Sequence, residues 1–401
     1  MELKNKNQII IAAAGNGKTY SIVKEALEIS KKTQKNILLI SYTNEGVLNL
    51  QKELKQQNNF LLKDNIEIKT WYSFLLNECI KPYQCLLNLS SKKTGQKFNI
   101  PPHYIKSMDF ETNKKSNINQ YCKKNIEYYI NKERDLIRDK ISDLVCKLNS
   151  DSEKKLLKRL EEIYSHIFID EIQDYNGYDL SFFDILLDSN IYTKFVGDPR
   201  QATFSTNNNR KNQQSKGINI TKYFEKIEKE NKCSIIYCNK TRRCNKYICS
   251  FVNTIYDIKE LNIMPYKENL NIDKEHIGVF LIGKENANLY WKNYEPIVLR
   301  WNKMKDIDIK DKCIIYNYGN SKGATFDRVM IYLTKPLSDF ILQNKRITSE
   351  AKSKFYVACT RAKYSICIVV DNVDNINISS NSNKFKKIKS LNEIPLLQFQ
   401  V

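Results

Sequence analysis

Short apolar runs alternate along the chain with longer segments whose apolar residues recur at helical spacing. Six of these runs predict strands, at Ile9–Ala13, Asn36–Tyr42, His166–Ile169, Thr193–Val196, Ile297–Arg300 and Val329–Leu333. Such alternation is typical of α/β domains with parallel sheets. No apolar run reaches the roughly 20 residues that cross a membrane, and the N-terminus lacks the apolar core of a signal peptide. We therefore expect an α/β protein of the cytoplasm with no membrane partner.

The length of 401 residues leaves room for two or three domains. The segment from about Leu75 to Leu160 is rich in Lys, Asn and Tyr, and it predicts mainly helices with polar loops. We interpret it as an insertion into the first domain. The polar segment Asn207–Ser215 predicts a loop before a second domain. The predicted layout is a first domain over residues 1–75 and 160–225, a helical insertion over 76–159 and a second domain over 226–401.

The first predicted strand runs into a loop of small residues that ends in Gly-Lys-Thr, and a helical segment follows. This order of strand, loop and helix is the one that binds a nucleoside triphosphate. Ala12 stands where the usual motif has its first glycine, but the loop can still turn at Gly15 and Gly17. We expect Lys18 to reach the β- and γ-phosphates of ATP and the Thr19 hydroxyl to bind Mg²⁺. The alternative is a turn that precedes a lysine by chance. The predicted nucleotide-binding residues of the loop are Ala12, Ala13, Ala14, Gly15, Asn16, Gly17, Lys18 and Thr19.

Polar side chains follow two other predicted strands. The strand His166–Ile169 ends in Asp170 and Glu171. We expect Asp170 to hold the Mg²⁺ ion together with Thr19, and Glu171 to polarise the attacking water. Gln201, after a further strand, is placed to contact the γ-phosphate. An Asp-Glu pair after a strand is common, and its meaning here depends on the phosphate loop that precedes it.

Two arginines are candidates to neutralise charge on the transferred phosphoryl group. They are Arg243, in Thr-Arg-Arg, and Arg361, in Thr-Arg-Ala. Each arginine taken alone also fits an ordinary surface charge. The predicted catalytic residues are Lys18, Asp170, Glu171, Gln201, Arg243 and Arg361.

The chain has 65 Lys and Arg against 45 Asp and Glu, a net charge of +20. In a nucleotide hydrolase such an excess favours a nucleic-acid partner. The alternative is a codon bias that leaves a solvated basic surface. The cysteines lack a framework of close pairs and are expected to be reduced thiols. A metal site at Cys233, Cys238, Cys244 and Cys249 is conceivable, but their spacing lacks a C-x-x-C knuckle.

The order of these motifs resembles that of the UvrD/Rep-type superfamily 1 helicases, almost from end to end. The matching segments are AAAGNGKT (motif I), ISYTNEGVLNL (Ia), IKTWYSFLL (the segment after it), FIDEIQDYN (II), VGDPRQATF (III), TRRC (IV), YGNSKGATFDRV (V) and FYVACTRAK (VI). The resemblance implies two RecA-like lobes with parallel sheets, with ATP and Mg²⁺ bound in the cleft between them. It also implies a path for single-stranded nucleic acid lined by Tyr42, Thr43, Asn44, Thr70, Ser73 and Phe204. Ordinary core packing is the alternative role of Tyr42 and Phe204.

The chain departs from the family pattern at the nucleotide base. The family places an arginine after Gly-Lys-Thr and an aromatic residue beside the motif IV arginine, whereas here Tyr20 and Arg242 stand at these positions. We expect these two to clamp adenine with exchanged roles, because a ring and a guanidinium stack from either side. In motif V, Gly323 and Thr325 join the predicted nucleotide site, with Thr325 in place of a glutamate that contacts ribose.

About twenty residues separate the strand Ile297–Arg300 from motif V, so the 2B subdomain of relatives has no counterpart. The resemblance implies an ATP-dependent helicase or translocase that moves 3′→5′ on single-stranded or tailed duplex DNA, in repair or antiphage defence. The alternative is a nucleic-acid- or nucleotide-responsive ATPase subunit that regulates a partner without processive unwinding. The compact form is similar to the helicase subunit of the Gabija antiphage system, whose partner is an OLD-type nuclease.

Overall fold

The computed structural model describes residues 7–61, 63–86, 89–90, 97–98, 123–131, 135–204, 206, 211–256, 258–269, 275–302, 307, 309, 312–371, 385–391 and 394–400. Its contacts divide the chain into two compact units. The first unit comprises Met1–Ile10, Lys18–Gly197 and Phe204–Ile236, and the second comprises Ile11–Gly17, Asp198–Thr203 and Tyr237–Val401. Two short segments at the carboxyl ends of β1 (Asn7–Ala12) and β7 (Tyr192–Gly197) are therefore grouped with the second unit, and the first of them includes the last two residues of β1.

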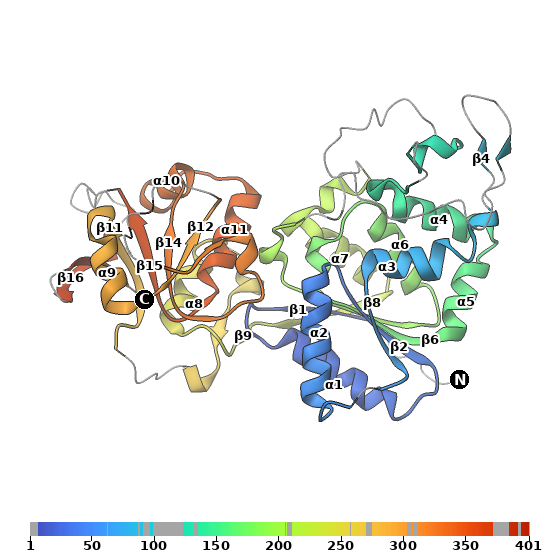
Figure 1. The fold of residues 1–401 in the computed structure, drawn as a ribbon, viewed down its shortest axis with the longest axis horizontal. Helices are drawn as coiled ribbons and strands as arrows, with labels where there is room; N and C mark the ends of the chain where they lie inside the picture. The colour runs from blue at the N-terminus through green and yellow to red at the C-terminus, as the bar shows by residue number, and fades with distance from the viewer. Residues whose placement is uncertain are drawn as a thin grey trace. The chain divides into compact units, whose positions relative to one another are not determined.

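The first sheet has six strands in the order β3-β2-β6-β7-β1-β8. Figure 1 labels β1, β2, β6 and β8 of this sheet. The pairs β2–β3, β2–β6 and β6–β7 are parallel. Four of these strands confirm predicted ones, with ends that differ by at most two residues. The strands are β1 (Asn7–Ala12), β2 (Asn36–Ser41), β3 (Ile66–Thr70), β6 (Tyr164–Ile169), β7 (Tyr192–Gly197) and β8 (Cys233–Cys238).

Two helices cover one side of this sheet with apolar positions at helical spacing. Helix α1 (Lys18–Ser30) buries Ile22, Val23, Ala26 and Leu27, and α2 (Asn44–Gln57) buries Leu50 and Leu54. These side chains form one core with strand residues of β2, β3, β6 and β7. Each fully buried leucine contributes about 1.5–3 kcal/mol relative to an exposed one. The remaining helices of the unit are α3 (Trp71–Phe74), α4 (Ile141–Asp151), α5 (Lys155–Ile163), α6 (Tyr178–Leu187) and α7 (Ile220–Lys229).

A buried carboxylate joins three of these helices. Asp179 of α6 accepts hydrogen bonds from the Trp71 indole Nε1 of α3 at 2.9 Å and from the Ser142 hydroxyl of α4. Burial raises the pKa of Asp179, and these hydrogen bonds oppose that rise. The contact fixes α4, at the end of the predicted insertion, against the helices of the first unit.

The described part of the predicted insertion agrees with a mainly helical segment. It holds a π-helix (Leu75–Ile80), helix α4 and most of α5, together with a short antiparallel pair of β4 (Leu89–Ser90) and β5 (Lys97–Phe98). The dipeptide Pro101–Pro102 and its surroundings lie outside the described residues. Single 3₁₀ turns of the first unit lie at Gln84–Leu86, Ile126–Tyr128, Arg138–Lys140, Ile172–Asp174, Gln213–Ser215 and Gly217–Asn219.

The second sheet has seven strands in the order β13-β12-β14-β15-β11-β17-β16. Its central pairs β12–β14, β14–β15 and β11–β15 are parallel, and β17 pairs antiparallel with β11. The predicted strands at Ile297–Arg300 and Val329–Leu333 are confirmed as β12 and β14. The strands are β11 (Gly278–Gly283), β12 (Ile297–Arg300), β13 (Ile315–Asn317), β14 (Phe326–Tyr332), β15 (Ala362–Val370), β16 (Phe385–Leu391) and β17 (Ile394–Phe399).

All six residues of strand β11 are buried in the core of this sheet. Apolar side chains of β11, β12, β14, β15 and β17 pack with Ala287 and Tyr290 of α9. A two-stranded parallel pair, β9 (Lys240–Thr241) and β10 (Met264–Pro265), lies in the same unit. The helices are α8 (Lys246–Asn253), α9 (Ala287–Tyr294), α10 (Lys335–Gln343) and α11 (Ser349–Cys359), with 3₁₀ turns at Pro199–Gln201, Lys259–Leu261, Lys267–Asn269, Lys284–Asn286 and Gly319–Ser321.

Both sheets confirm the predicted α/β class with parallel strands. The predicted domain boundary at residue 226 falls inside helix α7, and the chain stays in the first unit as far as Ile236. The physical reason is the hydrogen bonding of β8 at the edge of the first sheet. Among the described residues, no helix combines the length and apolarity that crossing a bilayer requires.

Candidate functional site

The predicted phosphate loop lies between β1 and the first residue of α1, Lys18. Gly15 and Gly17 have φ angles of 72° and 96°, a backbone region that side chains with a Cβ avoid. The loop therefore turns at the two glycines that the sequence singled out. Its N–H groups lie next to a helix N-terminus, where anions are stabilised.

The loop is grouped with the second unit, and residues 238–242 of that same unit hydrogen-bond to it. The Ala13 N–H donates to the Cys238 carbonyl at 2.9 Å, and the Thr241 hydroxyl donates to the Ala14 carbonyl at 2.6 Å. The Arg242 N–H donates to the Gly15 carbonyl at 2.9 Å. A Cβ added at Gly15 would lie 2.6 Å from the Cβ of Arg243, so the two backbones are in direct contact.

The Asn16 side chain extends the same contact. Its Nδ2 donates to the Lys240 carbonyl at 2.8 Å, while the Asn16 carbonyl accepts from Nη1 of Arg242 at 2.9 Å. Asn16 and Arg242, both predicted nucleotide-binding residues, are thus brought together.

The carboxylates after β6 meet the first turn of helix α1, and both lie in the first unit. The Thr19 hydroxyl donates to Oδ2 of Asp170 at 3.3 Å, and the Glu171 N–H donates to Oδ1 of Asp170 at 2.9 Å. Hydroxyl and carboxylate oxygens are the donors that Mg²⁺ prefers, so these two residues fit the predicted ion. The amide of Gln173 donates to the Glu171 carboxylate, and Glu171 itself has a φ of 56°.

Gln201 and Arg361 are in contact in the second unit. Nη2 of Arg361 donates to Oε1 of Gln201 at 3.2 Å. Arg361 is almost fully buried, and it also donates to the carbonyls of Val357 at 2.9 Å and Ala324 at 3.3 Å. Its guanidinium is therefore held rigidly between motifs III, V and VI of the sequence resemblance.

Arg243 lies against the same turn. Its Nη1 donates to the Thr360 carbonyl, next to Arg361, at 3.0 Å. Burial lowers the pKa of Arg243, which reflects the cost of holding a cation away from water. A cation in such surroundings gains more from an approaching anion than an exposed one does. Of the predicted motif V residues, Gly323 has a φ of 89° and Thr325 is exposed beside the Ala324 contact.

Arg242 stacks on an aromatic ring that the sequence reasoning missed. Its guanidinium lies 4.6 Å from the ring centre of Tyr266, which directly follows β10. The pairing of β10 with β9 brings Tyr266 to Arg242, and that pairing leaves no local signal in the sequence. Tyr20, the predicted second half of the clamp, is 50% exposed in the first unit.

The predicted nucleic-acid residues of the first unit divide into two groups. Tyr42 is half-buried, with its ring against Tyr72 and Tyr175 at 5.8 and 6.1 Å, so it takes part in packing. Phe204 is 46% exposed. Arg138, which was not predicted, lies 5.6 Å from the ring centres of both Tyr42 and Tyr72.

The predicted polar residues of the same path lie at two helix starts. The Thr43 hydroxyl caps α2 by accepting from the Gly46 N–H at 3.0 Å, and Asn44 is exposed at the first position of that helix. The Thr70 hydroxyl caps α3 by accepting from the Ser73 N–H at 3.2 Å. These hydroxyls have a structural role in shaping both helix ends.

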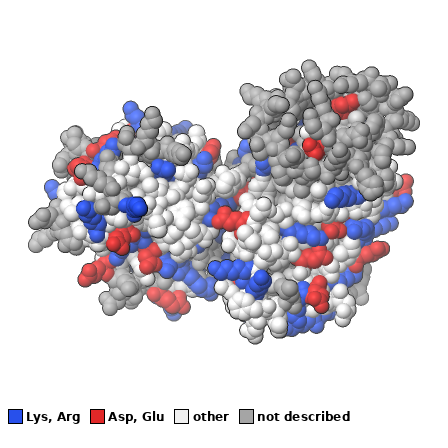
Figure 2. Space-filling model, in the orientation of Figure 1, with Lys and Arg blue, Asp and Glu red and all other residues white. Residues whose placement is uncertain are grey.

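The distribution of charged side chains and the positions of the cysteines do not identify a further binding site among the described residues. On the face that Figure 2 draws, Lys and Arg side chains are interspersed with Asp and Glu rather than gathered in one patch. Within the described ranges, no group of three or more His, Cys, Asp or Glu side chains is arranged to hold a metal ion. Of the cysteines considered for a metal, Cys233 and Cys238 lie in β8 and Cys249 in α8.

Two family models match the chain. The model described as an AAA domain matches residues 1–207, and the model described as a viral superfamily 1 RNA helicase core domain matches residues 115–370. Each match covers more than half of the chain. A search of the curated proteins found no match.

Solved structures with a similar fold include three helicase structures. The crystal structure of Arterivirus nonstructural protein 10 (helicase) is 12% identical with a TM-score of 0.44 and covers 92% of this chain and 61% of that one. The complex structure of the same helicase with DNA is 14% identical with a TM-score of 0.43, and it covers 92% of this chain and 61% of that one. The structure of PRRSV helicase is 13% identical with a TM-score of 0.42, and it covers 98% of this chain and 59% of that one. The chain thus spans about three fifths of the length of these proteins.

Proposed function

Because the chain belongs to the superfamily 1 helicases, we propose that it hydrolyses ATP to move along single-stranded nucleic acid. The observation that carries this proposal is the contact of the Thr19 hydroxyl with Asp170 at the end of the phosphate loop. It joins the two sequence signals of Mg·ATP hydrolysis, which lie far apart in the chain, at one point of the first unit.

The chemistry that we propose follows the chain's own groups. Lys18 binds the β- and γ-phosphates, and Thr19 and Asp170 hold Mg²⁺, which supplies charge neutralisation when it is bound. Glu171 orients and deprotonates the attacking water. Gln201 contacts the γ-phosphate, and Arg243 and Arg361 stabilise the charge on the transferred group. The other proposed nucleotide contacts are Ala12, Ala13, Ala14, Gly15, Asn16, Gly17, Tyr20, Arg242, Gly323 and Thr325.

We propose that a single strand of nucleic acid binds along the first unit. Exposed Phe204 and Asn44 contact the strand, and Tyr42 offers the edge of a packed ring cluster. Aromatic stacking contributes about 1–3 kcal/mol for each base and reads no sequence. The net charge of +20 supports a polyanionic partner.

Finer assignments follow the sequence resemblance to UvrD/Rep-type enzymes. We propose 3′→5′ movement on DNA, in repair or in antiphage defence beside a partner nuclease. The matching family model describes an RNA helicase core, so the choice between DNA and RNA has to be measured.

The test is displacement of a labelled strand from duplexes with a 3′ or a 5′ tail, made of DNA or RNA, with Mg·ATP. Wild-type protein should displace strands from 3′-tailed DNA, and Lys18→Ala should not. Displacement from 5′ tails alone would contradict the proposed direction. Hydrolysis without displacement from any duplex would support an ATPase subunit that acts only with a partner. Binding that does not weaken as salt rises would contradict phosphate contacts as the source of affinity.

A further inference from the structure

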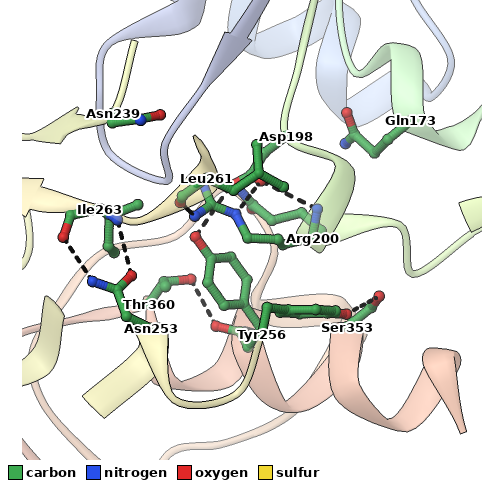
Figure 3. A network of polar contacts seen from close by, with 12 residues as sticks. Gln173, Asp198, Arg200, Asn239, Asn253, Tyr256, Leu261, Ile263, Ser353 and Thr360 are labelled. Carbon is green, nitrogen blue, oxygen red and sulfur yellow. Dashed lines mark hydrogen bonds and ion pairs between the residues drawn. The ribbon is translucent and has the colours of Figure 1, made fainter. Parts of the chain in front are cut away.

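A buried carboxylate lies next to the predicted γ-phosphate sensor. Asp198 directly follows β7 and has no exposed surface. Its Oδ1 accepts from Nε of Arg200 at 2.8 Å, and its Oδ2 accepts from Nε2 of Gln201 at 3.0 Å and from the Tyr356 hydroxyl at 3.2 Å. Figure 3 shows Asp198 and Arg200 at the centre of this network.

These contacts allow only one orientation of the Gln201 amide. A carboxylate only accepts hydrogen bonds, and a guanidinium only donates them. Asp198 therefore takes the NH₂ side of the amide, and Arg361 takes its oxygen at 3.2 Å. A flipped amide would face Asp198 with its oxygen and Arg361 with its protons, and both contacts would be lost.

Arg200 fixes Asp198 in turn. Its guanidinium lies 4.9 Å from the ring centre of Tyr356, and its Nη1 donates to the carbonyl of Leu261. The side chains of Arg200 and Asp198 are 2% and 0% exposed, so the pair is enclosed. Enclosed ion pairs contribute little to stability when compared with apolar replacements of the same size. This pair therefore calls for a role other than holding the fold together.

We propose that Asp198 and Arg200 are positioning residues that act through Gln201, setting its amide so that the oxygen faces Arg361. Tyr356 contacts both residues, because its hydroxyl donates to Asp198 and its ring stacks against the guanidinium of Arg200. The inference rests on the proposed function, in which Gln201 and Arg361 act on the γ-phosphate. It assigns a role in the reaction to two buried residues that are not among the proposed nucleotide or strand contacts.

The test is a double-mutant cycle of Asp198→Asn and Gln201→Ala, with kcat and KM for ATP measured at saturating single strand. If Asp198 acts through Gln201, Asp198→Asn alone should lower kcat about tenfold or more, as for a lost hydrogen bond to a charged group. In the Gln201→Ala background the same change should have no further effect. KM should change little in either case.

Two further variants separate positioning from folding. Tyr356→Phe keeps the ring under Arg200 and removes only its bond to Asp198, so it should give a smaller loss in kcat with an unchanged melting temperature. Ser353→Ala breaks the neighbouring contact of Ser353 with Tyr256, 2.9 Å long, and should leave kcat unchanged. Should Asp198→Asn not fold, Tyr356→Phe replaces it in the cycle.

The outcomes are distinct from those of the proposed function. Losses in kcat that multiply in the double variant would overturn the inference, because they would mean that Asp198 acts independently of Gln201. A wild-type chain that does not hydrolyse ATP would contradict the proposed function. The cycle would then be measured in the Kd for Mg·ATP, where non-additive losses support the positioning role and additive losses overturn it.

Discussion

Gly15→Ala should destabilise the protein far more than the matched change Gly17→Ala. Both glycines have positive φ angles, 72° and 96°, so an alanine at either position is strained. That strain costs about 1–2 kcal/mol. This strain is no smaller at Gly17 than at Gly15. Any larger loss of stability in Gly15→Ala must therefore come from packing.

The excess follows from the contact with the segment after β9. A Cβ at Gly15 would lie 2.6 Å from the Cβ of Arg243 and 2.8 Å from the Thr241 hydroxyl. The Cβ of Arg243 cannot move freely because it is attached to the backbone. The Thr241 hydroxyl is held because it donates to the Ala14 carbonyl. At Gly17 the nearest atom is the flexible end of Arg242, at 3.2 Å.

Overpacking of this kind costs about 1–3 kcal/mol. A change of 1 kcal/mol shifts the melting temperature of a unit of this size by about 2–4 °C. Thermal unfolding should therefore begin about 2–12 °C lower for Gly15→Ala than for Gly17→Ala. Equal shifts, or a larger one for Gly17→Ala, would refute the close contact between the loop and this segment.

Three further predictions concern chemistry, base binding and pH. Glu171→Gln should lower kcat about 10²–10⁴-fold while the Kd for ATP in a fluorescence titration stays nearly constant; turnover close to wild type would remove Glu171 as the base. Tyr266→Ala should raise KM for ATP about two- to fivefold by freeing Arg242, whereas Tyr266→Phe should not. If Tyr20→Ala and Arg242→Ala both leave KM unchanged, the adenine clamp does not exist. Burial, with a nearby arginine, lowers the pKa of His276 to about 3, so the folded state resists protonation and loses stability as pH falls from 6.5 towards 3. His276→Phe should remove about 2 kcal/mol of this loss in the free energy of unfolding at pH 5. The melting temperature of the variant should therefore fall less than that of the wild type between pH 7 and pH 5. An equal fall in both proteins would contradict the prediction.

The sequence predicted the local parts of this structure well. The branched apolar runs at Ile9 and Ile297 are strands, and the glycines before Lys18 turn the loop, because these features depend on neighbouring residues. Thr19 and Asp170 were expected to bind one Mg²⁺ ion, from the Gly-Lys-Thr loop and the carboxylates after a strand, and their side chains lie in contact.

What the sequence missed depends on long-range pairing. Tyr266 reaches Arg242 only because β10 pairs with β9, and β8 joins the first sheet although a polar segment before it suggested a linker. Arg200 lay inside a quoted motif, but its partners, Leu261 and Tyr356, are distant in the chain. Composition and periodicity carry no record of such contacts.

Steady-state ATP hydrolysis with and without a single-stranded oligonucleotide tests the central claim most directly. The account predicts turnover that the strand stimulates severalfold in the wild-type chain and that Lys18→Ala abolishes. Hydrolysis that ignores the strand, or that persists in Lys18→Ala, would contradict a nucleotide-driven motor on nucleic acid.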